Sequence, residues 1–120
     1  MNRVIPMLVG LVMIVGAAGH IFSPELYAQM IPAFLPMQFA NISAAVCEAI
    51  VGVLLFVPKY RANGGIGFML LMFAFLPIHV WDALQDAPAV GSPTVAVFRL
   101  VIQFLLIYTG WWIYKLHSTQ

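Results

Sequence analysis

The stretch that decides the fold is ANISAAVCEAIVGVLLFV, Ala40 to Val57, an apolar run with a single carboxylate, Glu48, near its centre. Its length is close to the ~20 residues that a helix needs to cross the hydrocarbon core of a bilayer. Because hydrocarbon disfavours an ionised side chain, we expect Glu48 to face the inside of a helix bundle, take up a proton or meet a polar partner. The candidate partners His79, Arg99 and Gln103 all lie in other apolar runs.

The composition of the whole chain indicates an integral membrane protein. Of its 120 residues, 63% are hydrophobic and 8% are charged, and the mean hydropathy is +1.01. Such a chain has too few polar side chains to cover a soluble domain. We expect one membrane domain over residues 1–120, in contact with the lipid bilayer and with no basic stripe of the kind that binds nucleic acid.

Four apolar runs are long enough to span a bilayer, at residues 4–22, 40–57, 64–84 and 95–114. Their backbone groups must be satisfied within each segment, so the sequence predicts an all-α fold, a bundle of four transmembrane helices. Between the first two runs, Ser23 and Pro24 suit the start of a short helix, whereas Pro32 and Pro36 prevent a long one. We therefore expect a short interfacial helix there, anchored by Tyr27.

The charged residues predict an orientation. With four spans, one side of the membrane carries Arg3, Lys59, Arg61 and Lys115, and the other side carries Glu25, Asp82 and Asp86. The positive-inside rule then places the N- and C-termini in the cytoplasm, and a bacterial inner membrane fits this charge bias. An alternative interpretation is that the first run is a secretory signal, because a basic residue precedes it and small residues end it.

Polar side chains within the runs cluster in the outer half of the bilayer. At a rise of 1.5 Å per residue, their depths from the outer ends of the helices are about 3 Å for His20, 6 Å for Arg99, 8 Å for His79 and 12 Å for Glu48 and Gln103. Arg99 and Gln103 share a helix face, as do His79 and Asp82. We expect a shared pocket with six candidate ligand-binding residues: Glu48, His79, Arg99, Gln103, His20 and Asp82.

Three further positions are interpreted as structural. On the second run, Asn41 and Gly52 form one small and polar stripe with Ala45 and Glu48, a face that is expected to pack inward. Pro77 lies inside the third run, where it removes one backbone donor and is expected to kink the helix about one turn earlier.

Each candidate also has a purely structural interpretation. Glu48 could form a buried pair that fixes helix register rather than bind a ligand or a proton. Arg99 could extend to the interface, where His20 and Asp82 could also lie. His117, in the polar tail, is expected to be solvated.

The single cysteine excludes one class of enzyme and gives no support to a metal site. Cys47 cannot form an internal disulfide or a Cys-x-x-Cys redox pair, and it points away from Glu48 around the helix. His20, His79 and Glu48 could together meet a metal ion, but their spacing matches no ligand motif. We assign no metal.

Four segments in order carry a resemblance to a known family: GHIFSPELYAQMIPAFLP at 19–36, EAIVGVLLFVPKYR at 48–61, FLPIHVWDALQD at 75–86 and FRLVIQFLLIYTGWW at 98–112. The chain resembles the small four-helix DoxX-like membrane proteins over nearly its whole length. The matching positions are Gly19, His20, Pro24, Pro32, Pro36, Glu48, Gly52, Pro58, Arg61, Pro77, Arg99 and Gln103. Leu100 stands where relatives often have proline.

The resemblance implies an association with quinone-linked redox systems, oxidative-stress systems or membrane-protein assembly. Our leading hypothesis is an accessory subunit whose outer-half pocket binds a quinone or another small amphipathic molecule. The second is an assembly or scaffold factor with a structural polar network, which recognises a membrane-protein partner or forms a homo-oligomer. The third is a quinone-linked oxidoreductase, in which Glu48 and His79 transfer protons and Arg99 stabilises negative charge.

Overall fold

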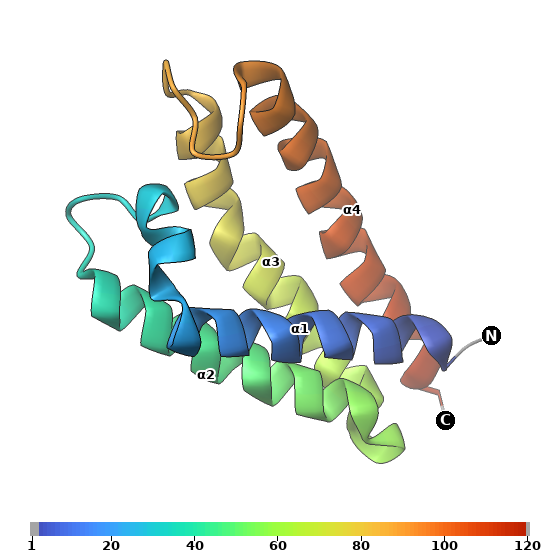
Figure 1. The fold of residues 1–120 in the computed structure, drawn as a ribbon. Helices are drawn as coiled ribbons and strands as arrows, with labels where there is room; N and C mark the ends of the chain where they lie inside the picture. The colour runs from blue at the N-terminus through green and yellow to red at the C-terminus, as the bar shows by residue number, and fades with distance from the viewer. Residues whose placement is uncertain (1–2, 120) are drawn as a thin grey trace.

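The computed structural model describes residues 3–119, and this part of the chain is helical without strands (Figure 1). Its elements in order are α1 (Val4–Phe22), the 3-10 helix η1 (Pro24–Met30), α2 (Met37–Phe56), the short 3-10 helix η2 (Pro58–Tyr60), α3 (Arg61–Ala83) and α4 (Pro93–His117). Within residues 3–119, four helices are long and apolar enough to cross a membrane. The predicted all-α bundle, with a short helix between the first two long ones, is confirmed.

The helices extend beyond three of the four predicted apolar runs. The bounds of α1 agree with the run 4–22, but α2 and α3 begin before residues 40 and 64, and α4 both begins before residue 95 and ends after residue 114. Hydropathy detects only the apolar part of a helix, whereas capping residues set its ends. In α4, Pro93 occupies the first turn and the Ser92 hydroxyl accepts a hydrogen bond from the Val95 N–H at 3.3 Å.

The long helices pair as two antiparallel hairpins, α1 with α2 and α3 with α4, and the hairpins meet where α2 packs on α3 (Figure 1). At one end of the molecule lie the start of α1, the end of α4 and η2. The hairpins diverge toward the opposite end, where η1 and the connection between α3 and α4 lie. Glycines permit close contact within each hairpin, because a β-carbon on Gly52 would lie 3.1 Å from the Gly10 carbonyl oxygen and one on Gly65 would lie 2.9 Å from that of Gly110.

Apolar side chains fill the bundle interior and also cover its outside. The buried core consists of Met13, Val51, Leu55, Phe68, Met72, Ile107 and Ile113. Large apolar side chains such as Val12, Val46, Leu70 and Phe104 are exposed on the long helices. This outer surface suits contact with acyl chains rather than with water.

Two basic side chains near the helix ends are buried. The expectation that His117 is solvated is wrong: it is 9% exposed, and its Nδ1 lies 2.9 Å from the Ile113 carbonyl oxygen. Because α4 continues past the predicted run, His117 falls on the inward face that carries Ile113. Arg61 is also buried, and it donates hydrogen bonds to the carbonyl oxygens of Leu55 at 3.0 Å and Phe56 at 3.4 Å, which caps the end of α2.

Candidate functional site

A cavity of about 230 Å³ lies between the two hairpins, toward the end where they diverge. Its polar lining comes from α1, η1, α2, α3 and α4, which supply His20, Tyr27, Glu48, His79 and Arg99 respectively. Apolar side chains, among them Ala44, Phe75 and Ile78, form the remaining walls. A cavity of ~150 Å³ accommodates benzene, so this one has room for a ring or a head group of similar size.

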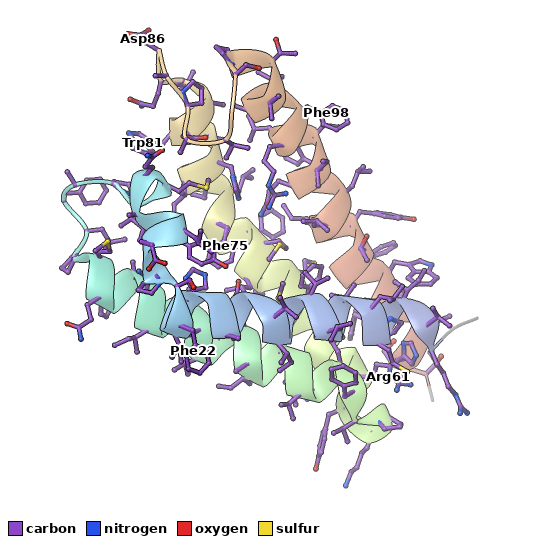
Figure 2. The ribbon with its side chains drawn as sticks, in the orientation of Figure 1. Phe22, Arg61, Phe75, Trp81, Asp86 and Phe98 are labelled. Carbon is purple, nitrogen blue, oxygen red and sulfur yellow. The ribbon has the colours of Figure 1, made fainter. Side chains whose placement is uncertain are left out.

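The labelled aromatic side chains show which faces of the helices look inward (Figure 2). Phe75 lies on the side of α3 that faces the other hairpin, in agreement with its place in the cavity wall. Phe22 and Phe98 point outward from α1 and α4, and both are strongly exposed. Of these three side chains, only Phe75 lines the cavity.

On the α1–α2 side, a hydrogen bond fixes the orientation of His20. The Asn41 amide nitrogen donates to the Met37 carbonyl oxygen at 3.2 Å, which turns the amide oxygen toward His20. His20 Nδ1 lies 2.7 Å from that oxygen, and we assign the ring proton to Nδ1 because only a donor satisfies the contact. Nε2 is then directed toward Glu48, with 3.7 Å between Nε2 and Oε2.

Glu48 faces the inside of the bundle, as its position in the sequence predicts. Asn41, Ala45, Glu48 and Gly52 are all buried, so the polar stripe of α2 packs inward. A β-carbon on Gly16 of α1 would lie 2.8 Å from Glu48 Oε2, which shows that the carboxylate occupies the space that a side chain at Gly16 would take. Within residues 3–119, Oε2 has no hydrogen-bond partner.

Tyr27 closes this side of the cavity from η1. Its ring stacks on His20, with 3.7 Å between the ring centroids and 18° between the ring planes. Its hydroxyl lies close to α1 at Gly19, where a β-carbon would be 2.7 Å away. Burial and the nearby Glu48 carboxylate both raise the pKa of Tyr27. The sequence identified Tyr27 only as an interfacial anchor, although its place five residues after Phe22 could have indicated a return toward α1.

On the α3–α4 side, two cavity residues have polar groups with no partner among residues 3–119. His79 is 9% exposed, and its Nδ1 is buried without a hydrogen bond to any of residues 3–119. Arg99 is half-buried and forms no ion pair within the same part of the chain. This side of the cavity therefore presents a guanidinium and an imidazole that are free to meet another molecule.

The sequence predicts Gln103 and Asp82 in the same pocket, and neither is among the residues that line this cavity. Gln103 lies one turn deeper than Arg99, where α3 and α4 already pack together, and its amide nitrogen donates to the Met72 carbonyl oxygen at 2.7 Å. The oxygens of Asp82 accept hydrogen bonds from the backbone N–H groups of Ala89 at 2.7 Å and Val90 at 3.3 Å. Asp82 thus holds the connection between α3 and α4.

The structure brings His20, Glu48, His79 and Arg99 to the cavity wall. Pro77 lies within α3, which continues through it, so the expected kink stays a prediction. Cys47 is exposed on α2 and does not line the cavity. Across residues 3–119, no three His, Cys, Asp or Glu side chains are grouped so that they could hold a metal ion. The arrangement can hydrogen-bond a polar head group while its walls contact an apolar body.

Comparison with known proteins identifies the family of the chain. No curated protein and no solved structure matches it. One family model, described as "Domain of unknown function (DUF8561)", matches residues 8–114. The matched segment contains every cavity residue named above. The chain therefore belongs to the DUF8561 family of domains of unknown function.

Proposed function

We propose that this protein is an accessory membrane subunit whose cavity binds the head of a small amphipathic molecule from the bilayer. The observation that carries the proposal is His79 Nδ1, a buried polar atom at the cavity wall with no partner in residues 3–119. A buried polar group without a hydrogen bond costs about 1–3 kcal/mol. A ligand that supplies the missing partner would recover this free energy, and the apolar walls would hold its body.

An isoprenoid quinone is the ligand class that the DoxX-like resemblance implies. The cavity residues fit its head, because His79, Arg99 and the Tyr27 hydroxyl can donate hydrogen bonds to carbonyl oxygens. A bound quinone would supply two-electron redox chemistry. An orientation with both termini in the cytoplasm, as the positive-inside rule predicts, would place the cavity in the outer leaflet of a bacterial inner membrane.

Native mass spectrometry of protein extracted from its own membrane tests this function. The wild type should carry an added mass from a lipid or a quinone. Ala44 lines the cavity, so Ala44→Phe should fill it and remove the added mass. Val46→Phe is the matched control, since it adds the same side chain two residues away on an exposed face of α2 and should retain the ligand. Absence of any ligand from both wild type and control would contradict the proposal.

A scaffold or assembly function is the second candidate, and the polar bonds between helices favour it. The His20–Asn41 bond ties α1 to α2, and the Gln103–Met72 bond ties α3 to α4. Such bonds can fix helix register without any ligand. Crosslinking in native membranes would support this function if one membrane-protein partner, or a second copy of the chain, recurred while no ligand was found.

A further inference from the structure

The acidic and the basic side chains at the cavity lie on different sides of it, Glu48 on the α1–α2 side and Arg99 on the α3–α4 side. Glu48 of α2 has the His20 ring across from it at 3.7 Å. On the opposite side, Arg99 of α4 has no acidic partner within residues 3–119. Asp82 forms no ion pair with Arg99, and its oxygens accept hydrogen bonds from the backbone N–H groups of Ala89 and Val90. Among residues 3–119, the guanidinium of Arg99 therefore reaches this wall of the cavity without an acidic side chain paired to it.

Placing an arginine at an apolar cavity wall without a counter-charge is costly. A guanidinium that loses water without gaining an acceptor raises the free energy of the fold. The guanidinium also has a planar set of donors that matches carboxylate and phosphate oxygens, which distinguishes it from a lysine. Arg99 is half-buried at a wall that it shares with Phe75 and Ile78, so it combines this head-group chemistry with an apolar surface.

His79 adds a second polar group without a hydrogen-bond partner, among residues 3–119, to the wall that carries Arg99. It is more than nine-tenths buried, it lines the same cavity as Arg99, and its Nδ1 has no partner within residues 3–119. An imidazole N–H can donate to an oxygen of a head group held by Arg99. Glu48 would repel an anion on its own side, so we expect the head group to lie toward α3 and α4.

We propose that the cavity selects an amphipathic molecule with an anionic head, a carboxylate or a phosphate on an apolar chain, and that Arg99 and His79 contact this head. The inference rests on the proposed function and narrows its ligand class, because a neutral quinone head would leave the charge of Arg99 uncompensated. An apolar chain distinguishes such a ligand from a free anion, since Ala44, Phe75 and Ile78 offer it a matching wall.

The test measures the affinity of the purified protein in maltoside for four probes. Dodecyl phosphate has both features, dodecanol has the chain without the charge, inorganic phosphate has the charge without the chain, and decylubiquinone has a neutral ring. Dodecyl phosphate should bind at least about tenfold more tightly than dodecanol, because its charged head can accept charge-assisted hydrogen bonds from Arg99. Inorganic phosphate, which lacks the apolar chain, should bind far more weakly than dodecyl phosphate.

Substitutions in α4 test whether Arg99 is responsible for the preference for dodecyl phosphate over dodecanol. Arg99→Gln should remove the preference, so that this variant binds dodecyl phosphate no more tightly than dodecanol. Arg99→Lys should retain part of the preference, because it keeps the charge but not the planar donors. Lys115→Gln is the matched control, since it removes an exposed positive charge from the other end of the same helix and should change neither affinity. Circular dichroism establishes that each variant is folded.

The possible failures are distinguishable. Equal affinities of the wild type for dodecyl phosphate and dodecanol, both lost in Ala44→Phe, would overturn the anionic selectivity and leave the proposed function intact. This comparison needs no Arg99 variant, so it decides the question even if Arg99→Gln does not fold. Tight binding of inorganic phosphate alone would overturn the requirement for an apolar chain. Binding of none of the four probes would contradict the proposed function itself.

Discussion

Gly65 of α3 and Gly110 of α4 bring two backbones into direct contact, because a β-carbon on either glycine would lie 2.9 Å from the carbonyl oxygen of the other. The contact extends to Tyr114, whose backbone nitrogen would be 2.6 Å from a β-carbon on Gly65. A side chain at either position cannot be accommodated by rotation of a flexible neighbour. The α3–α4 hairpin therefore depends on glycine at both positions.

We expect Gly65→Ala and Gly110→Ala each to lower the free energy of unfolding by about 1–3 kcal/mol, the usual cost of an added methyl group in a packed interior. Unfolding in mixtures of maltoside and dodecyl sulfate, followed by circular dichroism, measures the effect. Gly67→Ala is the control with a milder contact, since its nearest neighbour is a Val51 methyl group at 3.0 Å. Equal stability of all three variants would contradict this account of the hairpin.

Arg61 caps the end of α2 and Lys59 does not, so substitutions at these two positions should change the free energy of unfolding by different amounts. Arg61→Ala should destabilise the fold by about 1–3 kcal/mol, because the carbonyl oxygens of Leu55 and Phe56 lose their donor. Lys59→Ala should change stability by less than about 0.5 kcal/mol, because Lys59 is exposed. The same unfolding assay compares them, and an equal loss in both variants would show that charge rather than capping is responsible.

Asp82 is expected to order the connection between α3 and α4. In Asp82→Ala, the backbone N–H groups of Ala89 and Val90 lose their acceptor and should exchange with deuterium faster. Asp86→Ala removes an exposed acid from the same connection and should leave the exchange rates unchanged. Unchanged exchange in Asp82→Ala, measured by mass spectrometry of the 84–92 segment, would argue against this role.

Because the pKa of Tyr27 is raised, we expect the protein to lose stability at high pH. Burial and the Glu48 carboxylate raise its pKa, so the folded protein holds the phenol proton more tightly than the unfolded chain. The stabilisation is complete below the unfolded pKa of about 10 and is lost as the pH rises through the higher folded pKa. Stability measured between about pH 9 and 11 should therefore fall more steeply for the wild type than for Tyr27→Phe. In Glu48→Gln the pKa of Tyr27 should be lower, which the phenolate absorbance reports.

The architecture and half of the polar network could be predicted from the sequence. Length and hydropathy locate the four long helices, because backbone groups inside a bilayer must be satisfied within each segment. The cost of a carboxylate in hydrocarbon predicts that the stripe around Glu48 packs inward, and Asn41, Ala45 and Gly52 are buried beside it. Both inferences depend on the composition of single helices.

The sequence predicts His20, Glu48, His79 and Arg99 at the cavity, but it could not separate them from Gln103 and Asp82, because that depends on how the hairpins are placed. The spacing of Arg99 and Gln103 gives a shared helix face but not the depth at which α3 and α4 separate, so only Arg99 reaches the cavity. The carboxylate oxygens of Asp82 accept hydrogen bonds from the loop between α3 and α4. Helical periodicity in the sequence does not describe the path of this loop. The burial of His117 could not be predicted, because the apolar pattern ends before the helix does.

The pairing of the helices has a consequence for how the molecule is made. Each hairpin joins helices that follow one another in the chain, so α1 and α2 can associate before the second pair has left the ribosome. Arg99 and His79 arrive with the later pair, whereas His20 and Glu48 arrive with the earlier one. The cavity is therefore assembled last, and a molecule that bound there would also stabilise the final step of biogenesis.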